Sequence, residues 1–282
     1  MNNCEKLKLE FEKAIVNGLR ATKEFYNAVG KDNIPFDVQR SGLFKCIISN
    51  RFNVAKYIIE NNHNLVNVVY DIRDDKTKMS VVFLSALYLG IIKSKQKFLE
   101  LVKFLKYILT IKIDNISNVY LVSRNEKLWT VFDVILNPVK KNKNSTVPLE
   151  YFESIRFELL ALVINNDGFN PNIKCDLNKT PLIVLIKKLI NKEEYADKIK
   201  NLIKQLIKLP KCNINFCNNI YESPILLLTA VREYELVEFI LMNKNDVDLF
   251  LETSYCSSPI KIVNISNDQK LKNLFDKYLL KK

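Results

Sequence analysis

Apolar residues in this chain gather in short runs of helical length, and clusters of polar residues separate the runs. Three runs begin with a hydroxyl residue directly before a proline: Thr180 with Pro181, Ser223 with Pro224, and Ser258 with Pro259. A hydroxyl at the N-cap accepts a hydrogen bond from a free amide of the first turn, and proline at the first helical position lacks an amide that would have no partner. The pattern therefore predicts three helices that begin in the same way.

Less regular copies of this helix start occur upstream, at Ser41, Ser80 and Thr130, where no proline follows the hydroxyl residue. Between the helix starts a second pattern recurs, in which an apolar pair closes a helix and Asn, Asp, Gly or Pro then breaks it. It is found at 57–68, 162–173, 205–216 and 239–250, with a weaker copy at 107–116. Together the two patterns predict a repeated unit of helix, turn and helix.

With these features the chain resembles the ankyrin-repeat family, whose unit of about 33 residues is a β-turn plus two antiparallel helices. The match is closest over 172–264, where Asn172 and Asn215 each lie eight residues before a helix start, as the family's asparagine lies before its Thr-Pro-Leu-His signature. Asn178 stands where the family usually has glycine, and asparagine tolerates a left-handed turn. Asn215 and Asp248 are 33 residues apart but Asn172 and Asn215 are 43 apart, so we expect units with insertions.

The chain departs from the family at the histidine that ends the signature. Ile183, Leu226 and Lys261 occupy its place in the three most regular units. The hydrogen bond of that histidine is therefore absent, and we expect the helix pairs to be held mainly by apolar packing.

The resemblance implies an all-α fold, an ankyrin-like helical solenoid of about five to six irregular helix-turn-helix repeats with an N-terminal capping helix. We expect the capping helix and a linker in residues 1–40, because 7–29 place their apolar residues near one helical face. The repeat array is expected in 41–282 and is most regular over 172–264. A single repeat cannot bury its apolar face alone, so neighbouring repeats should stabilise one another.

Composition restricts the setting of the protein. With 282 residues, 48% of them hydrophobic, the chain is long and apolar enough to bury a substantial core. Its longest apolar stretch, 81–92, is shorter than the ~20 residues of a membrane-spanning helix, and its charged amino terminus lacks the pattern of a secretory signal. Six scattered cysteines fit reduced thiols. We expect a cytoplasmic or otherwise intracellular protein, with delivery into a host cell left open.

The sequence offers few means of catalysis. Its five glycines stand apart, which excludes clustered phosphate-binding loops, and its single histidine excludes a zinc helix with two histidines. Cys175, Cys212, Cys217 and Cys256 lie near inter-repeat turns, but helices stacked about 8–10 Å apart keep such thiolates from sharing one zinc at about 2.3 Å. We therefore expect a protein that is not an enzyme, with no catalytic residues, metal, cofactor or small-molecule substrate.

Two sets of residues leave alternatives open. The Ser-Pro and Thr-Pro pairs would suit proline-directed kinases, although their place at helix starts already explains them. Lys200, Lys204, Lys208 and Lys211 share one side of a helix whose other side is apolar, which fits either a solvated outer face or a docking site for an acidic partner.

The family resemblance implies a protein–protein interaction module that binds an unidentified partner protein through the concave face of the stack, where the turns and inner helices lie. By position, the partner-binding residues are expected to be Asp176, Leu177, Asn178, Lys179, Asn219, Ile220, Tyr221, Glu222, Tyr255 and Ser257. Tyr221 and Tyr255 are the expected anchors, because exposed aromatic residues concentrate binding energy. The net charge of +12 favours an acidic partner and leaves an alternative, electrostatic association with nucleic acid or an anionic membrane surface.

Overall fold

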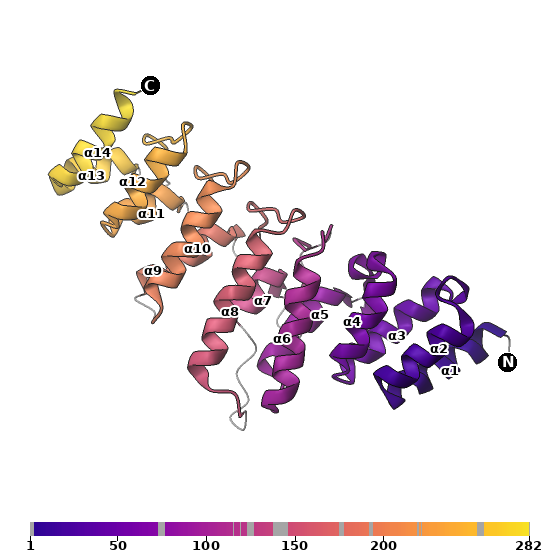
Figure 1. Cartoon of the computed structure of the whole chain (residues 1–282). Coiled ribbons are helices and arrows are strands. Elements are labelled where there is room, and N and C mark those ends of the chain that lie inside the picture. Colours follow the sequence, from indigo (N-terminus) through magenta and orange to yellow (C-terminus); the bar gives the residue numbers. More distant parts are fainter. Residues whose placement is uncertain are drawn as a thin grey trace. The chain divides into compact units, whose positions relative to one another are not determined.

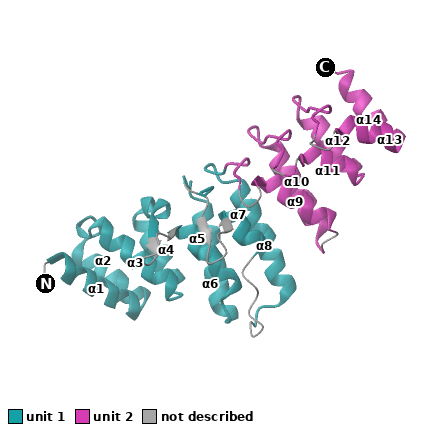
Figure 2. Cartoon of the chain, turned by 180° about the vertical axis from the view of Figure 1, so that it is seen from behind, with its two compact units in different colours: residues 1–169 teal, residues 170–282 magenta. Residues whose placement is uncertain are grey.

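The chain forms two compact units of paired helices, Met1–Phe169 and Asn170–Lys282 (Figure 2). The computed structural model describes residues 3–72, 77–114, 116–118, 120–122, 127–137, 146–174, 178–191, 194–218, 220, 222–252 and 257–281. Most of these residues are helical, and the strands among them form two short hairpins. The expected all-α repeat fold is confirmed, and each unit is described by itself below.

Unit 1, Met1–Phe169, contains helices and two antiparallel hairpins. The helices are α1 (Asn3–Asn17), α2 (Leu19–Val29), α3 (Phe36–Ile48), α4 (Phe52–Asn61), α5 (Val81–Leu87), α6 (Lys95–Leu109), α7 (Val131–Leu136) and α8 (Leu149–Ile164). Short 3-10 helices are η1 (Lys31–Asn33), η2 (His63–Asn67) and η3 (Tyr88–Gly90). The hairpins are β1 (Val69–Ile72) with β2 (Thr77–Ser80), in which Val69 faces Ser80, and β3 (Tyr120–Val122) with β4 (Lys127–Trp129), in which Tyr120 faces Trp129.

Unit 2, Asn170–Lys282, contains helices in its described residues and no strand among them. The helices are α9 (Pro181–Ile190), α10 (Ala196–Lys208), α11 (Pro224–Ala230), α12 (Tyr234–Asn243), α13 (Pro259–Ser266) and α14 (Gln269–Leu279).

In both units consecutive helices pack as pairs, and the pairs stack in two layers (Figure 1). In unit 1 the first layer consists of α1, α3, α5 and α7, and the second layer of α2, α4, α6 and α8. In unit 2 the first layer consists of α9, α11 and α13, and the second layer of α10, α12 and α14. Each helix thus contacts its pair partner and the neighbouring helices of its own layer, which is how a repeat protein buries apolar faces that no single pair can cover.

The first pair, α1 and α2, occupies the segment for which the sequence predicts one capping helix. The break between the two helices falls at Gly18, whose φ of 102° lies in the region that favours glycine. The hydroxyl of Thr22 donates to the carbonyl of Gly18 at 2.9 Å and so ties the start of α2 to the break. Six further helix pairs follow among the described residues, in agreement with the upper number of repeats expected. The predicted division of the chain at residue 40 stays a prediction.

The helix start predicted at Ser41 is wrong, because α3 already begins at Phe36. Pro35, at φ −54°, stands at the N-cap, and its carbonyl accepts hydrogen bonds from the amides of Val38 at 3.0 Å and Gln39 at 3.1 Å. A proline with this fixed φ is a strong helix-start signal that the hydroxyl pattern overlooks. Ser41 therefore lies inside the helix.

The core is mainly apolar, and the buried polar side chains within it include the N-cap residues Ser80, Thr130 and Thr180. In unit 1 large aromatic side chains join neighbouring pairs, for example Phe52 of α4 with Phe104 of α6 at a centroid distance of 6.0 Å. In unit 2 Ile183 is buried and Leu226 is half-buried at the positions of that histidine. At the third position Lys261 is exposed, and its ammonium pairs with the carboxylate of Glu252.

Candidate interaction surfaces

The turns that lead into the first-layer helices are fixed at one end by the predicted N-caps. The hydroxyl oxygens of Ser223 and Ser258 accept hydrogen bonds from helix amides at 3.3 and 3.4 Å, and Thr180 accepts one at 3.5 Å. Thr130 forms a full capping box with Asp133, and Ser80 caps α5. These five predicted helix starts are confirmed.

The same caps bear on the kinase alternative. Thr180, Ser223 and Ser258 are each 1% exposed. A kinase needs access to the hydroxyl, and in the folded protein these hydroxyls are buried and already accept hydrogen bonds from the helix. Their burial argues against phosphorylation of the intact fold.

At their other end the turns of unit 2 are tied together by an asparagine ladder, which we define as Asn172 and Asn215. The side-chain amide of Asn172 donates to the carbonyl of Lys211 at 2.6 Å and accepts from the amide of Asn213 at 2.8 Å. Asn215 repeats both contacts one repeat later, with Asp246 at 2.6 Å and Asp248 at 2.9 Å. Each turn is thus held to the next by two hydrogen bonds from one side chain.

The asparagine ladder corrects the repeat register that the sequence spacing indicates. Asp248 donates its amide to the side chain of Asn215, just as Asn213 does to Asn172. Asp248 is therefore the equivalent of Asn213 and not of Asn215. The 33 residues between Asn215 and Asp248 separate a ladder residue from the residue that it binds, and they are not the length of one repeat. The equivalent of Asn215 in the last described turn is Phe250, which lies eight residues before Ser258 and is 60% exposed.

The predicted turn residues of unit 2 fall into two groups. Asp176, Leu177, Asn219, Tyr221 and Tyr255 lie outside the described residues. The structure describes the other five, Asn178, Lys179, Ile220, Glu222 and Ser257.

Asn178 adopts φ 57°, so the left-handed turn expected from its place in the repeat is confirmed. Lys179 and Ser257 are half-buried. Ile220 is 46% exposed and is the one large apolar side chain that the described part of this set offers to solvent.

Glu222 is used within the protein itself. Its carboxylate pairs with the ammonium of Lys187 on α9 at 2.7 Å and accepts a hydrogen bond from the side chain of Asn218 at 2.7 Å. The side-chain oxygen of Asn218 in turn accepts from the amides of Ile220 at 3.0 Å and Glu222 at 2.9 Å. This network ties Asn218 to the backbone amides of Ile220 and Glu222 just before α11.

Unit 1 has a groove that the sequence patterns did not identify. It lies between α1, α3 and β1, and its empty space is about 780 Å³ including the part open to solvent. The residues that give it chemical character are Lys8, Asp37, Arg40, Phe44, Val69 and Tyr70.

The wall of this groove is an aromatic pair held in a fixed position. The rings of Phe44 and Tyr70 lie 4.7 Å apart between centroids, and the Tyr70 hydroxyl donates to the carbonyl of Arg40 at 2.5 Å. Burial raises the pKa of Tyr70 far above its ordinary value, so this hydroxyl stays a donor at neutral pH. Arg40 pairs with Asp37 at 3.3 Å on the rim. Tyr70 is buried behind Phe44, which is half-buried, so the groove offers a small apolar surface with charges beside it.

The groove escaped prediction because its residues come from three elements that are distant along the chain. A signal was present in two aromatic residues, Phe44 in the helix start predicted at Ser41 and Tyr70 just after the turn predicted within 57–68. The two rings come together because α3 starts at Phe36 and β1 follows η2, and the sequence patterns predict neither of these starts.

The lysine stripe of α10 is used largely inside unit 2. The ammonium of Lys200 lies 2.9 Å from the carboxylate of Glu233, and that of Lys204 lies 2.5 Å from Glu235. Hydrogen bonding to these carboxylates raises the pKa of Lys200, and bonding from Lys204 lowers the pKa of Glu235. Lys204 and Lys208 also lie over the ring of Phe239, at 5.5 and 5.9 Å from its centroid.

Thus three of the four stripe lysines, Lys200, Lys204 and Lys208, contact α12 of the next pair. They stabilise the stack and are less available to an acidic partner than their sequence spacing indicates.

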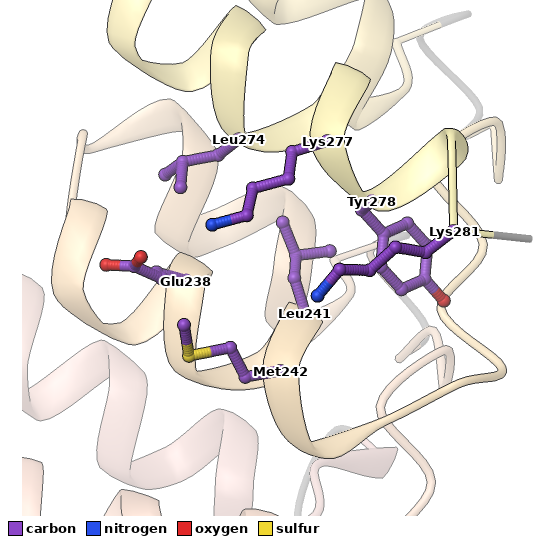
Figure 3. A pocket seen from close by; sticks show the side chains of 7 residues that line it. All are labelled: Glu238, Leu241, Met242, Leu274, Lys277, Tyr278 and Lys281. Atoms are coloured by element: carbon purple, nitrogen blue, oxygen red, sulfur yellow. The ribbon is translucent and has the colours of Figure 1, made fainter.

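A small hollow opens between α12 and α14 in the second layer of unit 2 (Figure 3). Leu241, Met242, Leu274 and Tyr278 give it an apolar lining. Its empty space is about 290 Å³, including the part open to solvent. The hollow is therefore small and suits a single side chain.

Among the described residues, no group of three or more His, Cys, Asp or Glu side chains lies together in a way that could hold a metal ion. Burial raises the pKa of Cys212 to about 11 and raises that of Cys46 well above its ordinary value, so both thiols are protonated at neutral pH. Within the same part of the chain, every helix is too short or too polar to cross a bilayer.

Comparison with known proteins gives a similarity of fold only. No protein-family model matches the chain. No curated protein matches it either. Among solved structures, the chain is similar to the crystal structure of EF0377, an ankyrin repeat protein, with 11% sequence identity and a TM-score of 0.45. The match covers 84% of this chain and 96% of that one. So loose a superposition adds nothing to the repeat assignment, which rests on the helix pairs, caps and ladder of this chain.

Proposed function

We propose that this protein is an ankyrin-type binding module for a partner protein, and that it binds through the turns and the first-layer helices. The observation that carries the proposal is the groove of unit 1, where the fixed rings of Phe44 and Tyr70 lie beside the charges of Lys8, Asp37 and Arg40. A hydrophobic centre with a charged rim is the usual composition of a protein-binding site. No enzymatic role is part of this proposal.

The anchored ends of the turns support the same proposal. In unit 2 an N-cap holds the end of each turn next to its first-layer helix, and the asparagine ladder joins the other ends. Anchored ends reduce the entropy that a turn can lose when a partner binds. Among the predicted turn residues that the structure describes, Ile220 offers an exposed apolar side chain to a partner, whereas the carboxylate of Glu222 pairs with Lys187 inside the protein.

The experiment is affinity capture with charge-reversed variants, followed by mass spectrometry at low and high salt. Lys8→Glu combined with Arg40→Glu changes the groove rim. Arg20→Glu combined with Lys31→Glu changes the charge equally at exposed positions of α2 and η1. A protein retained at high salt by the wild type and the control, and lost with the groove variant, supports the proposal. The same proteins captured by both variants would refute the groove as the site.

The alternative, electrostatic association with nucleic acid or an anionic membrane surface, is favoured by the net charge of +12. Binding of this kind weakens steeply with salt, because phosphate contacts release counterions. Titration of labelled DNA, RNA and anionic vesicles at low salt tests it directly. An absence of binding there would remove this alternative.

A further inference from the structure

The hollow between α12 and α14 differs from the neighbouring contact in the same layer of unit 2. Between α10 and α12 the charges are paired: the ammonium group of Lys200 contacts the carboxylate of Glu233, and that of Lys204 contacts the carboxylate of Glu235. Between α12 and α14 the charged side chains beside the hollow are Glu238 on α12, Lys277 on α14, and Lys281 in the turn after α14 (Figure 3). Among the described residues none of these three side chains forms an ion pair within 4.0 Å.

The hollow has a fixed floor and an open, apolar side. The hydroxyl of Tyr278 donates to the carbonyl of Asn245 at 2.9 Å and accepts from the amide of Val247 at 3.0 Å, which holds the ring in place. Leu241 and Leu274 are half-buried beside it. Met242 is 62% exposed at the edge. A flexible thioether at the edge of an apolar hollow adapts well to an incoming side chain.

The charges around the hollow are two lysines and one glutamate. Lys277 lies on α14, and Lys281 lies in the turn that follows the last helical residue, Leu279. Glu238 stands on the opposite helix. In Figure 3 the two lysine side chains extend across the hollow toward α12. Two ammonium groups and one carboxylate border the hollow, so its charges favour an acidic occupant.

We propose that this hollow docks an acidic segment of a partner protein, with one apolar side chain entering between α12 and α14. Two carboxylates on one side of that side chain meet Lys277 and Lys281, and a neutral residue on the other side faces Glu238. A uniformly anionic membrane fits less well, since Glu238 repels it and the apolar surface is recessed. The hollow is in the second layer, so the inference is independent of the groove in unit 1.

Met242 provides a direct probe. The chain contains three methionines, Met1, Met79 and Met242, so a carbon-13 methyl-methionine spectrum of the intact protein has few signals. The ligand is a capped synthetic peptide with one leucine, two glutamates on one side of it and glycines on the other. The control peptide has glutamine in place of both glutamates. Met242→Leu assigns the signal, and circular dichroism confirms that each variant is folded.

The expected result is a saturable shift of the Met242 methyl signal with the acidic peptide, without a matching shift of Met79. Lys277→Ala combined with Lys281→Ala should raise the dissociation constant about fivefold, as expected for the loss of two exposed ion pairs. Lys270→Ala combined with Lys272→Ala removes the same charge elsewhere on α14 and should leave the dissociation constant unchanged.

Three results would overturn the inference: no shift of Met242 at millimolar peptide, an equal shift with the glutamine peptide, or equal binding by the Lys277 and Lys281 double variant. A shift of Met242 with vesicles of phosphatidylserine but not with the peptide would also overturn it, in favour of a membrane surface.

Discussion

Gly168 follows α8 at a point where the backbone of unit 1 crosses itself closely, and its replacement by alanine gives a quantitative test of the fold. A Cβ at this position would lie 1.9 Å from the carbonyl oxygen of Ile113 and 2.8 Å from its carbonyl carbon. Both atoms belong to the backbone, so they cannot rotate away as the end of a side chain can. Gly168→Ala therefore has to separate the two backbone segments.

The separation breaks a hydrogen-bond network around Asn166. Its side-chain oxygen accepts from the amides of Ile113 and Gly168, each at 3.2 Å. Its side-chain amide donates to the carbonyls of Leu109 at 3.0 Å and Ile111 at 2.8 Å. Overpacking costs about 1–3 kcal/mol and each lost hydrogen bond about 1 kcal/mol. We expect Gly168→Ala to lower the free energy of unfolding of unit 1 by about 2–4 kcal/mol.

The assay is urea unfolding followed by tryptophan fluorescence. Trp129 is the one tryptophan of the chain and lies on β4, so its signal reports on unit 1. With an m-value of about 2 kcal/mol/M, the midpoint should fall by about 1–2 M. Asp167→Ala, at the exposed neighbouring residue, is the control and should stay close to the wild type. A Gly168→Ala midpoint equal to that of the control would refute the close approach to Ile113.

Three further predictions concern unit 2. Asn215→Ala removes both ladder hydrogen bonds to the turn before α13 and should lower the free energy of unfolding of unit 2 by about 1–2 kcal/mol. Asn215→Asp keeps the acceptor and should lower it less. Urea unfolding followed by circular dichroism measures both variants. Thr180→Ala removes the N-cap of α9 and should cost about 1 kcal/mol by the same measurement; an unchanged midpoint would contradict the capping role. Cys212, with a pKa of about 11 raised by burial, should react with iodoacetamide far more slowly than exposed Cys4 at pH 8, as measured by peptide mass spectrometry, and equal rates would contradict its burial. The pKa of Cys212 is about 11 in the folded protein and about 9 in the unfolded chain. Between these two pH values the unfolded chain loses the thiol proton and the folded protein keeps it, so the free energy of unfolding should fall as the pH rises above about 9.

The sequence sufficed for features that depend on residues close together in the chain. The caps at Thr180, Ser223 and Ser258 need one hydroxyl and an amide three residues later. The left-handed turn at Asn178 needs only a residue that tolerates positive φ. Such local chemistry determines where helices begin, and the alternation of helix and turn then gives the paired architecture.

Features made by distant residues were missed or misread. The partners of Asn215 lie 31 and 33 residues away, so the spacing could not distinguish a ladder residue from the residue it binds. The lysine stripe of α10 has the pattern of a solvated face, yet Glu233 and Glu235 reach it from the next pair. Periodicity along one helix cannot indicate which helix stacks beside it.

The asparagine ladder joins neighbouring repeats in the same way although the repeats differ in length. Asn172 and Asn215 are 43 residues apart, whereas Asn215 and Phe250 are 35 apart, yet both intervals span one repeat. The longer interval contains the longer helices, α9 and α10, of 10 and 13 residues against 7 and 10 for α11 and α12. The two helices of a repeat can therefore lengthen toward the connection that joins them, while the turns at their other end stay linked by the ladder hydrogen bonds. The connection between α9 and α10 is accordingly the place where an inserted tag or a small domain should be accepted with the least disturbance.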